Sequence, residues 1–165
     1  MNFSTCDICD ENESMLMDES LKILTSEFTS YGAKESFFGQ VQTVKVYDDN
    51  LEIRNMLEKS GKGKVLIVDG GGSRNSALLG GNIASLANLN NWSGIIVNGC
   101  VRDIEELKSI NIGILAIGVS PKKSFKVFGR QNTNLKINGT LIRPNEWIYR
   151  DINGILISKC EIKKN

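Results

Sequence analysis

Apolar positions near the N-terminus of the chain recur at the spacing of a helix. Leu21, Leu24 and Phe28 are three and four residues apart, and Ser4 is suited to cap a helix that begins after it. The pattern therefore predicts helical structure over residues 4–31.

The middle of the chain alternates between two other patterns. One is a helix pattern, and the other is a strand pattern that is either alternating or continuously apolar. The continuous form is typical of strands buried on both faces. The predicted strands cover 39–50, 64–72, 93–99 and 112–120. The predicted helices cover 50–63, 80–92 and 102–110, the first of them capped by Asn50. This rhythm predicts parallel strands joined by right-handed crossovers.

The C-terminal part predicts antiparallel hairpins instead. Asn-Gly pairs stand at 138–139 and 153–154, each between apolar runs, and Asn-Gly is the preferred sequence of a tight hairpin turn. There is no interdomain linker and no solenoid repeat. We therefore expect residues 1–165 to form one α/β domain with parallel βαβ units and an antiparallel C-terminal hairpin region.

Composition agrees with a globular domain and narrows its partners. The 165 residues are 41% hydrophobic and 24% charged, with a net charge of +1. No run approaches the roughly 20 apolar residues of a membrane span, and no secretory signal pattern is visible. We expect a cytoplasmic protein with no membrane partner. The basic segment 120–130 could contact RNA or an acidic protein, but the near-neutral charge favours a solvated loop and no direct nucleic-acid partner.

The chain contains no histidine. This excludes a Ser-His-Asp triad, a Cys-His pair and histidine-ligated metals within one chain. Acid–base chemistry is left to carboxylates, lysine, tyrosine, cysteine or metal-bound water, and any metal should be a hard ion held by oxygen. Cys6 and Cys9 form a single C-x-x-C without the second pair of a zinc ribbon, so we expect free thiols.

Two glycine-rich turns follow predicted strands. The sequence VDGGGSRN (68–75) lacks the Gly-Lys-Ser/Thr ending of a phosphate-binding loop, and Asn75 replaces the third glycine of the dinucleotide fingerprint. A tight strand exit is favoured there, although Asp69 ends a strand at a ligand-binding edge. Gly80 and Gly81 precede a predicted helix, whose free N–H groups suit a carboxylate. Alternatively, Asn82 simply caps that helix.

Arg102 and Asp103 stand side by side between a predicted strand and helix, and two interpretations are open. Asp103 and Glu106 match a D-x-x-E capping pattern, with Arg102 merely exposed. Alternatively, Arg102 points at the sheet edge where the Gly80–Gly81 helix also starts. A carboxylate substrate, an arginine and an aspartate-held cation would then converge.

The block VDGGGSRNSALLGGNIASLANLNNWSGIIVNGCVRDIEELKSINIGILAIGVSPKKS resembles the RraA-like, or class II 4-hydroxy-4-methyl-2-oxoglutarate aldolase, family. The likeness extends to STCDICDEN near the N-terminus and RPNEWIYRDINGILIS near the C-terminus. It implies a mixed ββα sandwich of the swivelling-domain type, assembled as a ring-shaped homotrimer with sites near the subunit boundaries.

The resemblance also implies a chemistry. Enzymes of this family cleave 4-hydroxy-4-methyl-2-oxoglutarate to two pyruvates and decarboxylate oxaloacetate as a side activity, using Mg²⁺ or Mn²⁺. Arg102 would contact the substrate oxygens, and Asp103 would hold the metal largely through its water shell. The substrate carboxylate would be held by Gly80, Gly81, Asn82 and Ile83. No Schiff-base lysine is required, and nothing else in the sequence supports Lys45 in that role.

Two departures from the aldolase pattern keep an alternative open. Many aldolases carry an aspartate where this chain has Gly81, and longer members carry a C-terminal extension that lends a carboxylate to a neighbour. In both respects the chain resembles the branch that binds ribonuclease E and inhibits RNA decay. Members of that branch can lack the aspartate of the Arg-Asp pair, so Asp103 favours the lyase over the regulator.

Overall fold

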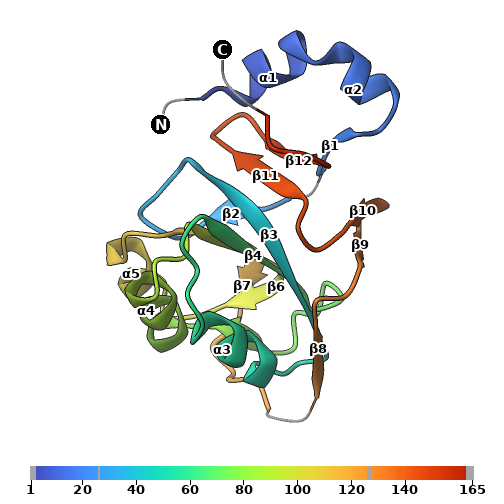
Figure 1. Cartoon of the computed structure of the whole chain (residues 1–165). Coiled ribbons are helices and arrows are strands. Elements are labelled where there is room, and N and C mark those ends of the chain that lie inside the picture. The colour runs from blue at the N-terminus through green and yellow to red at the C-terminus, as the bar shows by residue number, and fades with distance from the viewer. Residues whose placement is uncertain (1–2, 26, 126–127, 163–165) are drawn as a thin grey trace.

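The computed structural model describes residues 3–25, 27–125 and 128–162, and its elements build one mixed sheet with helices beside it (Figure 1). The helices are α1 (Thr5–Glu11), α2 (Glu13–Met17), α3 (Leu51–Leu57), α4 (Gly81–Leu89) and α5 (Ile104–Ser109). The strands are β1 (Leu21–Ile23), β2 (Thr29–Ser30), β3 (Phe37–Val46), β4 (Lys64–Asp69), β5 (Ala77–Leu79), β6 (Gly94–Val101), β7 (Gly113–Val119), β8 (Gly129–Gln131), β9 (Leu135–Ile137), β10 (Thr140–Ile142), β11 (Trp147–Arg150) and β12 (Ile155–Ser158).

Parallel strands form the centre of the sheet, as the strand–helix–strand rhythm predicts. The main path runs β1-β12-β11-β3-β4-β6-β7-β2, in which β3, β4, β6 and β7 are mutually parallel. The register pairs Lys45 with Asp69 and Asp69 with Asn98, so polar residues from three strands meet in one row at the carboxyl edge. β5 and β8, which periodicity did not reveal, pair with β6 and β3.

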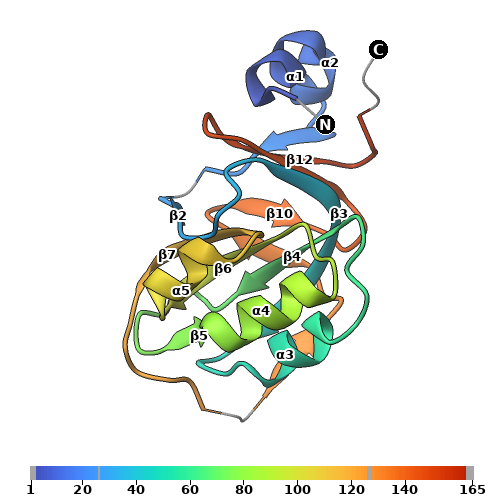
Figure 2. The same ribbon diagram turned by 90° about the vertical axis from the view of Figure 1, so that its left-hand side faces the viewer.

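The two faces of the sheet bury separate apolar clusters. On one face, Val44, Leu66 and Ile95 belong to a cluster that also contains residues of α3, α4 and α5, and these three helices cover that face in Figure 2. On the other face, Val41 and Ile96 belong to a cluster that includes residues of β9, β10, β11 and β12. The predicted mixed α/β sandwich is therefore confirmed.

Both predicted C-terminal hairpins are present. Asn138 (φ 45°) and Gly139 (φ 81°) form the left-handed turn between β9 and β10, as an Asn-Gly pair allows. The turn between β11 and β12 is closed by Asp151, whose carboxylate accepts from the turn and from Thr5. Burial alone would raise the pKa of Asp151, but these hydrogen bonds outweigh it and lower the pKa.

The prediction of a helix over 4–31 is wrong beyond Met17. Ser4 does cap α1, because its hydroxyl accepts from Asp7 N at 3.3 Å. Asp18 Oδ1 accepts from Ser20 N at 2.8 Å and turns the chain out of α2. Strand β1 follows, in which Leu21 is buried beside β12, and β2 pairs with β7. Within the described residues, no helix is long and apolar enough to cross a bilayer.

Candidate functional site

The helix α4 begins directly at the glycine pair. Gly80 occupies the cap position and Gly81 is the first helical residue, so Asn82 lies inside the helix and the alternative of Asn82 as the cap is wrong. Gly80 has extended backbone angles that any residue adopts. A Cβ atom on Gly80 would instead lie 2.5 Å from Asp103 Oδ2 and 3.1 Å from Arg102 Cγ. This glycine therefore makes room for two charged side chains.

Arg102 and Asp103 leave the end of β6 next to that pair. Arg102 N donates to Leu79 O at 3.0 Å, which joins the ends of β5 and β6. Asp103 Oδ2 accepts from Gly81 N at 3.1 Å and lies 3.7 Å from Arg102 Nε. The structure thus brings together Gly80, Gly81, Arg102 and Asp103, as the sheet-edge interpretation expects.

The alternative capping role of Asp103 is not what the structure shows. Asp103 occupies the cap position of α5 with a left-handed backbone (φ 60°) and makes no side-chain capping bond to that helix. Its carboxylate is bonded to the start of α4, one helix away. Asn50 likewise occupies a cap position without a side-chain bond, and Asp49 accepts from Leu51 N instead.

The charged groups of the site are accessible from solvent. The side chains of Arg102 and Asp103 are 39% and 44% exposed. Asn82 and Ile83 complete the first turn of α4, where N–H groups have no intrahelical acceptor. The side chain of Ile83 is buried in the core, so only its backbone can face a ligand. The site can therefore offer amide donors, a guanidinium and a carboxylate to a small anion.

Sequence reasoning gave Glu106 only a capping role and missed its position beside Gly81. A Cβ atom on Gly81 would overlap the Cδ atom and both carboxylate oxygens of Glu106. The carboxylate therefore fills the space that a side chain at position 81 would take. The signal in the sequence was the three-residue spacing from Asp103, which places both residues on one face of a helical turn.

The other glycine turn is closed upon itself. Gly70 N and Gly72 N both donate to Asn98 O, at 3.0 and 3.2 Å, and Gly71 N donates to Asp69 Oδ1 at 2.9 Å. Asn98 Nδ2 donates to the same carboxylate at 2.9 Å. Because these amides are all bonded, either to Asp69 or to Asn98 of the adjacent strand β6, the geometry supports a tight strand exit.

Lys45 stands beside this closed turn. Its Nζ lies 3.9 Å from Asp69 Oδ2, across the pair of strands β3 and β4. Asp69 is only 4% exposed, so Lys45 supplies the positive charge that a buried carboxylate requires. This ion pair gives Lys45 a structural role.

The carboxylates beside α4 suit a hard divalent cation. The carboxylates of Asp103 and Glu106 both lie against the Gly80–Gly81 pair, and both offer oxygen atoms as metal ligands. Within the described ranges there is no group of three or more histidine, cysteine, aspartate or glutamate side chains placed to bind a metal. Mg²⁺ is commonly held by one or two carboxylates and several waters, so this donor set fits it.

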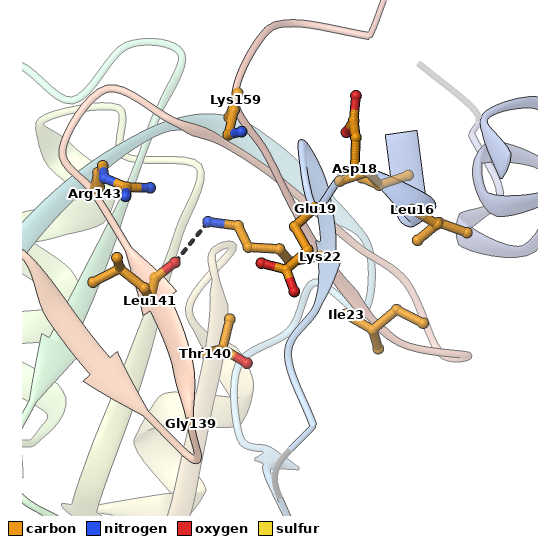
Figure 3. A pocket seen from close by; sticks show the side chains of 11 residues that line it. Leu16, Asp18, Glu19, Lys22, Ile23, Gly139, Thr140, Leu141, Arg143 and Lys159 are labelled. Carbon is orange, nitrogen blue, oxygen red and sulfur yellow. Dashed lines mark hydrogen bonds between the residues drawn. The ribbon is translucent and has the colours of Figure 1, made fainter. Parts of the chain in front are cut away.

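A cavity of about 530 Å³ lies elsewhere, between the α2–β1 turn and the β9–β10 hairpin (Figure 3). Lys22 points across it, and its Nζ donates to Leu141 O at 2.6 Å and to Glu146 Oε1 at 2.9 Å. Arg143 and Lys159 also line the cavity. The predicted site residues lie outside this cavity.

The basic segment 120–130 is described only in part. Lys122 Nζ lies 5.5 Å from the centre of the Phe125 ring, which is exposed. Lys126 lies outside the described residues.

The chain is similar to several known proteins. Residues 5–157 match the RraA-like family, described as Aldolase/RraA. An Arabidopsis thaliana protein with the provisional name 4-hydroxy-4-methyl-2-oxoglutarate aldolase 3 is 47% identical over 161 residues, 97% of each chain. The solved structure of the RNA-processing inhibitor RraA from Thermus thermophilis is 38% identical, with a TM-score of 0.92 over 99% of this chain and 96% of that one.

A second solved structure is equally similar in fold. It is named S-adenosylmethionine:2-dimethylmenaquinone methyltransferase from Geobacillus kaustophilus, and it is 36% identical with a TM-score of 0.92 over 99% of this chain and all of that one. The names of these relatives thus refer to three different activities.

Proposed function

Because the chain belongs to the RraA-like family, we propose that it is a lyase that cleaves 4-hydroxy-4-methyl-2-oxoglutarate into two molecules of pyruvate. We include the decarboxylation of oxaloacetate as a secondary activity. Since relatives of this chain carry names with different activities, the choice rests on the chemistry of the site. The convergence of Arg102, Asp103 and Gly81 is the observation that supports it.

Binding of the substrate is assigned to the start of α4. The first-turn amides of Gly81, Asn82 and Ile83 would donate to one substrate carboxylate, helped by the positive end of the helix dipole. Asp103 Oδ2 accepts from Gly81 N in this structure, so an arriving carboxylate would share or take that amide. The absence of side chains at Gly80 and Gly81 leaves room for Arg102, Asp103 and Glu106 beside the start of α4.

Arg102 would stabilise the charge that develops during cleavage. In the aldol reaction the 4-hydroxyl group loses its proton, the C3–C4 bond breaks, and one pyruvate leaves while its partner remains as an enolate that is protonated at C3. Oxaloacetate passes through the same enolate when the bond to its distal carboxylate breaks and CO₂ leaves. A guanidinium beside the keto oxygen favours this enolate over the neutral ketone, which lowers the barrier for both reactions.

A divalent cation, Mg²⁺ or Mn²⁺, is part of this proposal, with Asp103 as its protein ligand. When bound, it would act as a Lewis acid on the keto oxygen. The charges of the residues call for such an ion. Arg102 carries one positive charge against the two negative charges of Asp103 and Glu106, and the substrate adds two more negative charges. Without a cation, this concentration of negative charge would oppose binding.

A coupled assay for pyruvate tests the proposal directly. The purified protein is incubated with the hydroxy-keto diacid or with oxaloacetate, in Mg²⁺, in Mn²⁺ and in chelator. We expect release of pyruvate from both substrates with either metal and none with chelator. If neither substrate is turned over with either metal, the lyase proposal is wrong.

Assembly as a homotrimer with sites near the subunit boundaries belongs to the same proposal. Light scattering should then give three times the mass of one chain. A monomeric protein that still released pyruvate would separate the activity from the assembly.

A regulator that binds ribonuclease E is the second candidate function. It is supported by the similarity to the RNA-processing inhibitor RraA at 38% identity. We expect a regulator to form a stable complex with purified ribonuclease E that survives the Asp103→Ala substitution. Size-exclusion chromatography of the mixture would show the complex, and its absence together with pyruvate release would favour the lyase alone.

A further inference from the structure

The carboxylate of Glu106 occupies a place that the sequence of α4 leaves empty. Gly81 has no side chain, and a Cβ atom built on it would overlap the carboxylate of Glu106. Since Gly81 is buried, this carboxylate lies directly over the first peptide of α4. An acidic group therefore stands at the start of α4 although it belongs to α5.

Asp103 and Glu106 reach the glycine pair together. Asp103 Oδ2 crowds the position of a Cβ on Gly80 and accepts from Gly81 N, while Glu106 covers Gly81 itself. Asp103 occupies the cap position of α5 without a side-chain bond to that helix, and Glu106 is the third helical residue, so both lie on the side of the first turn that meets α4. Both side chains remain exposed to solvent, as a hydrated cation requires.

The neighbouring Glu105 shows that this orientation is particular to Glu106. Its side chain is 93% exposed and its Oε1 lies 3.4 Å from Lys108 Nζ on its own helix. Two adjacent glutamates thus carry the same charge, but only Glu106 overlies the glycine pair. Stabilisation of the α4 dipole would account for a single carboxylate there, since the first turn of α4 has no acidic residue of its own. Two carboxylates with one arginine leave excess negative charge.

We propose that Glu106 is a second carboxylate for the divalent cation of this site, acting with Asp103 from the space that a side chain at position 81 would fill. This inference rests on the proposed function for the presence of the cation. It differs from that proposal in naming α5 as the source of both acidic groups. Because α5 supplies both, one short helix would determine the affinity for the metal.

Titration with Mn²⁺ in the absence of substrate tests this role without relying on activity. Isothermal titration calorimetry is performed on the full chain and on Glu106→Gln, with Glu105→Gln as the matched control. We expect Glu106→Gln to weaken Mn²⁺ binding by about tenfold or more, the effect typical of groups that orient a metal and its waters. Glu105→Gln should change the affinity less than about twofold, as its exposed position implies.

Moving the carboxylate from position 106 to position 81 tests whether the two positions share one space beside the cation. Glu106→Ala should weaken Mn²⁺ binding, and adding Gly81→Asp to it should restore the affinity to within a few-fold of the natural chain. Gly81→Asp alone should lower the thermal unfolding midpoint, because two side chains then compete for one space. A double variant no better than Glu106→Ala would overturn the proposal.

The remaining outcomes separate this inference from the lyase proposal. Equal Mn²⁺ affinities for Glu106→Gln and Glu105→Gln overturn it, and a lower unfolding midpoint with unchanged affinity assigns Glu106 to capping α4 and also overturns it. Loss of Mn²⁺ binding in Glu106→Gln supports it even if the natural chain releases no pyruvate. In that case only the lyase proposal fails.

Discussion

Two turns of this protein contain adjacent glycines, but the backbone amides of the two turns have different hydrogen-bond partners. The first turn follows β4 and lies next to Asn98 of β6. The second turn follows β5 and lies next to Asp103, which comes after β6. In the turn after β4, Asp69 is 4% exposed and the glycine amides bond within the turn or to its neighbour Asn98. In the turn before α4, the amide of Gly81 bonds to Asp103, a half-exposed carboxylate from another helix.

This difference shows how to tell a structural glycine turn from a functional one. A turn whose donors are satisfied by a buried local carboxylate has none to spare for a ligand. A turn whose donor meets a remote, solvent-exposed carboxylate holds a contact that a ligand can replace at little cost. We therefore expect the turn after β4 to hold the edge of the sheet rigid, and this contrast supports the proposal that the turn before α4 binds the substrate.

Replacing Arg102, which lies beside the turn before α4, should have the largest effect on turnover. Arg102→Ala is expected to lower the turnover number for pyruvate release by about 10²–10³-fold, the cost of removing one group that stabilises developing negative charge. Steady-state kinetics with oxaloacetate and with the hydroxy-keto diacid would measure this loss. Arg54→Ala, an exposed arginine paired with Glu58 on α3, is the control and should leave turnover unchanged.

Replacing Asp69 and Asp103 by alanine, one at a time, should separate the contribution to stability from the contribution to activity. Asp69→Ala removes a buried acceptor from Asn98 and Gly71 and leaves Lys45 without its partner, so we expect a loss of about 3 kcal/mol in the free energy of unfolding. Asp103→Ala should cost less than about 1 kcal/mol, because its side chain is half-exposed, while abolishing metal-dependent turnover. Chemical denaturation and the pyruvate assay would measure both effects; equal losses of stability would contradict the contrast between the turns.

Substituting one glycine in each turn should sharpen the contrast further. Gly71 has a φ of 65° with open space around its Cα atom, so Gly71→Ala should cost about 1 kcal/mol of stability through backbone strain. Gly80 has no such strain, but a methyl group there would push on Asp103 and Arg102. Gly80→Ala should therefore lower turnover and leave the free energy of unfolding within about 0.5 kcal/mol. Denaturation curves of both variants, compared with their kinetics, would show whether each glycine is needed for conformation or for space.

Sequence patterns predicted the parallel core and the hairpins because these depend on local periodicity and on Asn-Gly turns. The continuous apolar runs that became β4 and β6 need burial on both faces wherever they are placed. The helical spacing of Leu21 and Leu24 was misleading, since β1 is a three-residue strand whose burial comes from β12, far along the chain. Local patterns cannot show such a partner.

The candidate site was predictable in its residues but not in its contacts. Arg102 and the glycine pair could be placed together because parallel strands end at one edge of a sheet. The bond from Gly81 N to Asp103 depends on the angle between α4 and α5, and so does the position of Glu106. A D-x-x-E pattern has the same spacing whether it caps its own helix or turns towards a neighbouring one.

The smallest predicted effect is the pH dependence of the stabilisation by Asp48, whose carboxylate accepts hydrogen bonds from the segment after β4. Ser73 Oγ donates to Asp48 Oδ1 at 2.6 Å and Asn75 Nδ2 donates to Oδ2 at 3.1 Å, and these bonds lower the pKa of this carboxyl. A carboxyl with a lowered folded-state pKa stabilises the fold above the pKa of the unfolded chain, about 3.9, and loses this contribution as the pH falls through the folded value.

The Asp48→Asn variant should therefore be less stable than the natural chain at neutral pH, and the difference should shrink below about pH 4. Denaturation of both proteins across this range would measure it. Asp103, beside the turn before α4, is the comparison, because its side chain is half-exposed and Asp103→Asn should leave the free energy of unfolding nearly unchanged at neutral pH. A difference for Asp48→Asn that stays constant with pH would show that its charge does not hold the closed turn, and the contrast would then rest on Asp69 alone.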